Sequence, residues 1–92
     1  MSFKYNQATL QLLESIFSEN RYVVRYEKGS FNSGYCILED KRVVVINKFF
    51  DVEARINTLI DIMSQVELSV EGLDEKQEAL FKNLSQQKLD IE

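Results

Sequence analysis

Few side chains in this sequence could carry out chemistry, because it contains no histidine and one cysteine. Metal sites built on imidazole, histidine acid–base catalysis and Ser-His or Cys-His nucleophile pairs are therefore excluded within the chain. Cys36 lies among Tyr35, Ile37 and Leu38, and such apolar surroundings disfavour the thiolate form that reacts. We predict that Cys36 is buried and unreactive, with a reactive thiol as the alternative. We expect no catalytic residue, no metal and no cofactor.

The segment 52–66 offers the remaining polar candidates. Arg55 is predicted at the edge of an apolar helical stripe, where its charge must reach solvent or meet a carboxylate. The ring of Phe50 could lie against the guanidinium. We expect Arg55 to anchor the structure, and recognition of an acidic ligand or partner is the alternative.

A row of polar residues recurs every four positions along the same segment: Glu53, Asn57, Asp61 and Gln65. This spacing is typical of the solvated face of an amphipathic helix. It would also suit a polar site. A small-ligand-binding or enzymatic site around Arg55 and Asp61 is therefore the alternative to a non-catalytic function.

Tyrosines gather near one end of the predicted sheet: Tyr22, Tyr26 and Tyr35, with Phe31 in a neighbouring loop. Tyrosine is favoured where a side chain is partly buried and partly wet, as at protein interfaces. These residues are candidates for contact with a ligand or partner. The alternative is that they pack the sheet beneath the helices.

A narrow leucine seam is predicted on the last helix, formed by Leu73, Leu80 and Leu84 at spacings of seven and four residues. Such a seam resembles one side of a coiled coil and requires a partner helix. The partner is either a helix of the same chain or a second copy, and both possibilities stay open at this point.

The elements that must position these residues follow from hydrophobic periodicity and capping signals. A helix begins after the N-cap Asn6 and ends near Asn20. Another begins after the N-cap Asp51, and a capping box of Asp74 and Gln77 starts a third. The expected elements are a helix over 7–20, a strand over 21–27, a loop over 28–34, strands over 34–39 and 42–47 joined by a tight turn at 39–41, a helix over 52–66 and a helix over 74–88.

The order α-β-β-β-α-α predicts an α+β fold, a three-stranded antiparallel meander packed with helices. We expect the strands over 34–39 and 42–47 to be covered at least in part on both faces, because they are almost continuously apolar. The length of 92 residues suits a single domain over 1–92. A net charge of −4 argues against nucleic-acid binding, and no apolar run has the length of a membrane span.

The hairpin GYCILEDKRVVVIN followed by DVEARINTLIDIMSQ is similar to small uncharacterised conserved proteins of Bacteroidetes-type bacteria. It also resembles the hairpin-then-helix core of the ImmA/IrrE-like zinc peptidases. In that resemblance the two zinc-binding histidines fall at Asp61 and Gln65 and the glutamate falls at Ile62. The resemblance implies a scaffold that lacks the metal and the peptidase activity.

Taken together, the residues predict a small cytoplasmic module for protein–protein interaction or self-association, acting without catalysis. We expect a homodimer or a complex with another protein, and no contact with membranes.

Overall fold

The computed structural model describes the backbone of residues 4–28 and 35–91 and the side chains of residues 4–28, 35–38 and 40–84. It confirms an α+β architecture. Most of the loop predicted over 28–34, with Phe31, lies outside the described residues. The elements in chain order are α1 (Gln7–Glu19), β1 (Val23–Glu27), β2 (Tyr35–Leu38), the 3-10 turn η1 (Glu39–Lys41), β3 (Val43–Asn47), α2 (Val52–Met63) and α3 (Glu75–Ile91).

The sheet is mixed, so the prediction of an antiparallel meander is wrong. The strand order is β1-β3-β2. β3 pairs parallel with β1, with Val23 opposite Val43, and antiparallel with β2, with Leu38 opposite Val43. The physical reason is that the most continuously apolar strand, β3, takes the central position, where both of its edges are paired.

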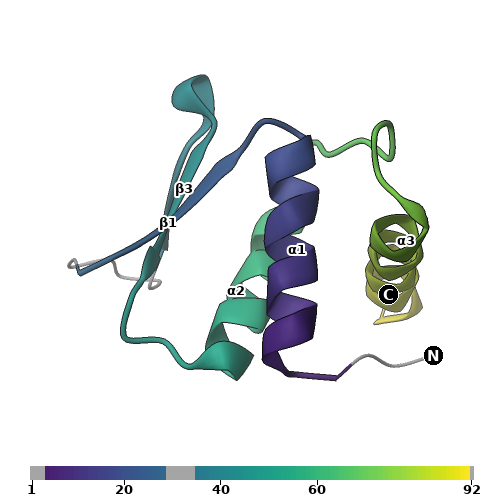
Figure 1. The fold of residues 1–92 in the computed structure, drawn as a ribbon, viewed down its shortest axis with the longest axis horizontal. Coiled ribbons are helices and arrows are strands. Elements are labelled where there is room, and N and C mark those ends of the chain that lie inside the picture. The colour runs from purple at the N-terminus through teal and green to yellow at the C-terminus, as the bar shows by residue number, and fades with distance from the viewer. Residues whose placement is uncertain (1–3, 29–34, 92) are drawn as a thin grey trace.

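The helices form two layers on one side of the sheet (Figure 1). α1 and α2 cover the sheet, and α3 packs on the far side of α1. The fully buried side chains between the sheet and the first helical layer are Leu10, Leu13, Ile16, Phe17, Val44, Ile46, Ile56, Leu59 and Ile62. The sequence predicted at least partial cover on both faces of the strands. On the face away from α1 and α2, however, no helix lies in the part of the chain that the structure describes.

The helix starts follow the capping signals in the sequence. Asn6 Oδ1 accepts a hydrogen bond from the Thr9 amide at 2.9 Å. Asp51 Oδ1 accepts one from the Ala54 amide at 2.8 Å. Asp74 and Gln77 form the reciprocal capping box at the start of α3, with both hydrogen bonds at 2.8 Å.

The end of α1 turns sharply into β1. The Tyr22 amide donates to the Phe17 carbonyl and the Arg21 amide to the Ser18 carbonyl, both at 2.9 Å. This is the Schellman pattern, in which glycine usually takes the left-handed position. Here Arg21 holds it, with φ of 67°.

Across residues 4–28 and 35–91, none of the helices combines the length and the apolarity that crossing a membrane requires.

Candidate functional site

Arg55 joins three elements of the fold. Its Nε donates to the Phe50 carbonyl and its NH2 group donates to the Lys48 carbonyl, each at 2.9 Å. The guanidinium also lies 4.2 Å from the centre of the Tyr26 ring on β1. The aromatic partner is therefore Tyr26, whereas the sequence suggested the ring of Phe50. These contacts tie the segment before α2 to the sheet.

Tyr26 continues this connection to α1. Its hydroxyl donates a short hydrogen bond to Glu14 Oε2. Burial raises the pKa of Tyr26 well above its ordinary value of 10.0, and the hydrogen bond and negative charge of Glu14 raise it further. The neutral phenol is therefore the stable form, and the chain Glu14–Tyr26–Arg55 links α1, β1 and α2.

Asp61 lies elsewhere, on the exposed side of α2. Its Oδ2 accepts a hydrogen bond from the Tyr35 hydroxyl at 2.8 Å. The Gln65 amide nitrogen donates to that hydroxyl at 2.6 Å. The structure thus brings Asp61, Tyr35 and Gln65 together, and it places Arg55 with Tyr26 in a separate cluster.

The third tyrosine of the predicted aromatic surface is buried. Tyr22 is 8% exposed and contacts the Phe17 ring edge to face, with centroids 6.2 Å apart. Each described tyrosine of that group, including Tyr26 and Tyr35, has a polar or aromatic partner within the chain. Their contacts are those of side chains that hold helices on the sheet.

The leucine seam of α3 faces the chain's own core. Leu80 is 8% exposed and Leu84 is 5% exposed, and Leu73 packs against the same core. α3 lies against α1, which makes α1 the partner helix. These leucines are not the free association surface that the spacing left open.

Cys36 is half-buried, so the prediction that it is buried is wrong. Cys36 pairs with Val45 of β3. Val44 and Ile46, on either side of Val45, are buried beneath the helices, so Val45 and Cys36 lie on the opposite side of the sheet. We call this side the open face. Its members are Val23, Arg25, Glu27, Cys36, Leu38, Val43, Val45 and Asn47.

The open face combines apolar and paired charged side chains. Val23 is 54% exposed and Leu38 41% exposed. Arg25 forms an ion pair with Glu27 at 2.5 Å. The alternation of Val23 and Arg25 with buried neighbours was visible in the sequence, but which of the two faces lacked a cover was not.

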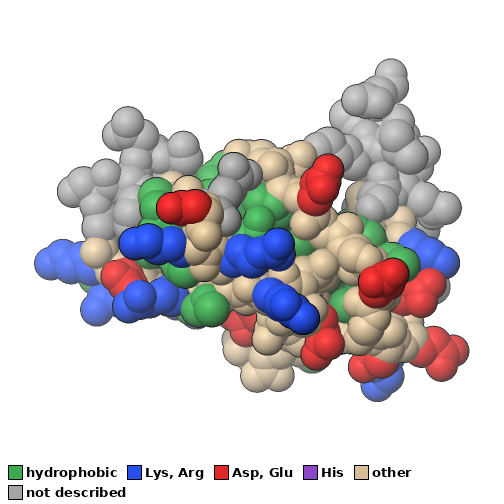
Figure 2. Space-filling view, turned by 90° about the horizontal axis from the view of Figure 1, so that it is seen from above, with side chains coloured by type: hydrophobic (Ala, Val, Ile, Leu, Met, Phe, Trp, Pro, Cys, Tyr) green, Lys and Arg blue, Asp and Glu red, His purple; other side chains and the backbone are tan. Residues whose placement is uncertain are grey.

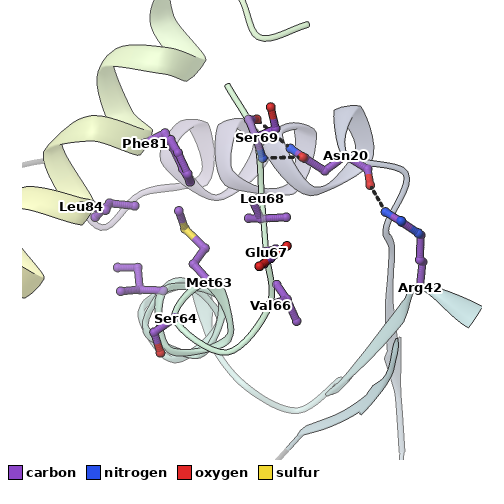
Figure 3. A pocket seen from close by; sticks show the side chains of 11 residues that line it. Asn20, Arg42, Met63, Ser64, Val66, Glu67, Leu68, Ser69, Phe81 and Leu84 are labelled. Carbon is purple, nitrogen blue, oxygen red and sulfur yellow. Dashed lines mark hydrogen bonds between the residues drawn. The ribbon is translucent and has the colours of Figure 1, made fainter. Parts of the chain in front are cut away.

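A groove that was not predicted from the sequence lies between the helical layers. It has a volume of about 530 Å³, and it runs from Phe81 and Leu84 on α3 past Met63 on α2 to Arg42 beside the sheet (Figure 3). The described residues that line it are Asn20, Arg42, Ile60, Met63, Ser64, Val66, Glu67, Leu68, Ser69, Phe81 and Leu84. The eleven described lining residues come from four separate stretches of the chain, so no local motif could have predicted the groove.

Asn20 fixes one wall of this groove. Its side-chain oxygen accepts from the Ser69 amide at 2.7 Å, and its side-chain nitrogen donates to the Ile16 carbonyl at 2.9 Å. The Asn20 carbonyl accepts from Arg42 at 3.1 Å. One residue thereby holds the segment after α2 and the start of β3 against the end of α1.

Among the described residues, no group of three or more Cys, Asp or Glu side chains is placed to hold a metal ion. Comparison with known proteins finds no matching family model and no significant match among curated proteins or solved structures. The resemblances noted from the sequence therefore stay predictions, and a function has to be inferred from the surfaces themselves.

Proposed function

We propose that this protein is a non-catalytic interaction module that associates with a second copy of itself through the open face of the sheet. The observation that carries the proposal is the one-sided cover of the sheet: α1 and α2 lie on one face, and no described element lies on the other (Figure 1). Excluding water from a sheet face that carries valines and a leucine lowers the free energy, so covering this face with another surface is favourable.

The charges of the open face favour a second copy as the partner. Arg25 and Glu27 neutralise each other within one chain. Two such faces can therefore approach without the repulsion expected between other surfaces of a chain whose net charge is −4. An isologous two-fold contact requires a surface that is compatible with itself, and this one is.

The alternative of a ligand or enzymatic site around Arg55 and Asp61 has less support. The Arg55 guanidinium is engaged by two carbonyl groups and one aromatic ring. Asp61 accepts from Tyr35 in a different cluster. A ligand at either residue would first have to replace contacts that hold the fold.

The size of the open face indicates how strong the dimer should be. Three strands of four to five residues cover roughly 250 Å² in projection. Standard interfaces bury about 800 Å² from each partner. We therefore expect a weak dimer, populated at about 100 µM and above.

The test is sedimentation equilibrium over a wide range of protein concentration. The average mass should rise from the 10.8 kDa of one chain toward twice that value. Val23→Glu should abolish the rise, because a carboxylate in the contact loses its water. Val70→Glu is the matched control: Val70 is also exposed, at 41%, and lies between α2 and α3 away from the sheet.

Alkylation of Cys36 gives a second reading of the same contact. Its rate in the parent protein should fall as protein concentration rises, and it should not fall in Val23→Glu. A mass that stays at 10.8 kDa up to about 1 mM, or an equal effect of Val23→Glu and Val70→Glu, would contradict the proposal.

A further inference from the structure

The groove between α2 and α3 is separate from the open face and has the properties of a small-molecule site. Its volume of about 530 Å³ lies within the range of about 300–1,000 Å³ found for ligand pockets. Most of its side chains are apolar, and several of these are only half-buried, including Met63, Leu68 and Phe81. An occupant would remove this surface from water.

The same volume favours an occupant thinner than a docked helix. An α-helix with side chains is about 10–12 Å wide, so one turn of it fills roughly 500 Å³. Recognition of a helix in a groove uses anchors spread over two turns or more. The groove therefore holds one extended chain of methylene groups better than a segment of protein.

The end of the groove beside the sheet is cationic. The Arg42 side chain is exposed. It donates a hydrogen bond to the Asn20 carbonyl, and its guanidinium lies 5.7 Å from the centre of the Tyr22 ring. Among the described residues it has no carboxylate within ion-pair distance. The Val23 amide donates to the Arg42 carbonyl at 2.8 Å, which joins the start of β1 to the residue that precedes β3. Figure 2 shows Lys and Arg side chains gathered toward the sheet and Asp and Glu side chains toward α3.

The backbone of Arg42 has a conformation that is uncommon for residues other than glycine. Arg21 and Arg42 are the two described residues other than glycine with positive φ, at 67° and 53°. Glycine or asparagine adopts this conformation with less strain. At Arg42 this conformation coincides with a guanidinium that the Asn20 carbonyl and the Tyr22 ring hold at the end of the groove.

From the apolar lining and the cationic end, we infer that the groove binds a single-chain amphiphile with a carboxylate head group. The hydrocarbon tail lies along Met63, Leu68 and Phe81, and the carboxylate meets Arg42, whose planar guanidinium can bind both of its oxygens. Glu67, the other charged group among the described lining residues, opposes an anion and limits the affinity.

Calorimetric titration with three probes of the same chain length tests this inference. Decanoate, decanol and decyltrimethylammonium should bind in that order of affinity. The two ionic probes are kept below their micelle concentrations and decanol below its solubility limit. Amide chemical shifts on binding should change at residues 63–69 and 81–84. A change confined to strands β1 to β3 would place the ligand on the open face and overturn the inference.

Variants of the charged groups separate the head-group contact from the tail contact. Arg42→Asn, which keeps a residue suited to positive φ, should weaken decanoate binding about three- to fivefold and leave decanol binding unchanged. Glu67→Gln should strengthen decanoate binding. Arg25→Asn, on the open face, is the matched control and should change neither.

Equal affinity for the three probes, an unchanged ratio of decanoate to decanol affinity in Arg42→Asn, or no saturable binding would each overturn the inference. The thermal midpoint of every variant, measured without ligand, shows that a lost affinity is not a lost fold. Because the open face takes no part in this titration, its outcome is independent of the proposed dimer.

Discussion

Replacing Arg55 by methionine should destabilise the fold strongly, although Arg55 is a charged and only partly buried residue. Methionine keeps the apolar stem and removes both hydrogen bonds to the carbonyls of Lys48 and Phe50. It also removes the cation above the Tyr26 ring. The segment before α2 then loses its attachment to the sheet.

The magnitude follows from these contacts. A hydrogen bond to a charged group contributes about 1.5–3 kcal/mol, and a cation–π contact about 0.5–2 kcal/mol. The bond to Lys48 is exposed to solvent, and contacts of one side chain are not additive. We expect a loss of about 2–3 kcal/mol from an unfolding free energy of about 5–15 kcal/mol.

Urea unfolding measures this loss. With a slope of about 1 kcal/mol per molar urea for a chain of this size, the midpoint for Arg55→Met should fall by about 2 M or more. Arg55→Lys should regain little of it, because one ammonium group cannot serve both carbonyls and stack on the ring. Arg25→Met is the control, since the contact that the structure describes for the Arg25 side chain is an exposed ion pair, and it should stay within about 0.5 kcal/mol of the parent.

A midpoint for Arg55→Met that matches that of Arg25→Met would refute the anchoring interpretation. The guanidinium would then be free in solution, and recognition of an acidic ligand would become the better explanation of its presence.

Three further outcomes are expected. Leu84→Glu should lower the unfolding free energy, measured with urea, by about 3 kcal/mol or more, because it places an unpaired charge at a site 5% exposed. The control Lys82→Gln, on the solvent side of α3, should lower it by less than about 1 kcal/mol. A stable Leu84→Glu monomer would contradict the packing of α3 on α1. Arg21→Gly should raise the unfolding free energy by about 0.5 kcal/mol, because glycine adopts the positive φ without strain; a lower thermal midpoint would show that the Arg21 side chain contributes more than its strain costs. The pKa of the Tyr26 phenol is raised in the folded chain. The phenol therefore stabilises the fold fully below about pH 10 and loses this effect as pH rises above that value, since only the unfolded chain ionises there. Tyr26→Phe should flatten the fall in urea midpoint between about pH 9 and pH 11, and an unchanged slope would show that the phenol does not titrate as described.

The helices and their caps could be predicted because their causes are local. Asn6, Asp51 and the pair Asp74–Gln77 each act within three residues of themselves. The strand order depends on pairing between distant segments, and alternation of side chains does not state which strand is the neighbour. Two features of the sequence did indicate the strand order. The connection over 28–34 is longer than a usual hairpin loop, and VVVIN, as the most continuously apolar strand, suits the central position.

The candidate sites were harder to predict for the same reason. That Arg55 would anchor the structure followed from the cost of an unpaired charge, but its partners are backbone carbonyls and the ring of a residue 29 positions earlier. The open face depends on which side of the sheet α1 and α2 cover. The groove depends on where α3 comes to rest after the segment 64–74. Neither is encoded in a short stretch of sequence.

The central position of β3 has a consequence for how the chain acquires its structure during synthesis. β1 and β2 both leave the ribosome before β3, and they have no pairing with each other in the finished sheet. A nascent chain that ends at residue 42 can therefore form α1 but none of the strand ladder. The parallel partners β1 and β3 are separated by about 20 residues, so their pairing requires closure of a long loop, which slows folding. During that interval the backbone amides and carbonyls of β1 and β2 stay unpaired, and nascent chains held at this length should be the species most prone to aggregate.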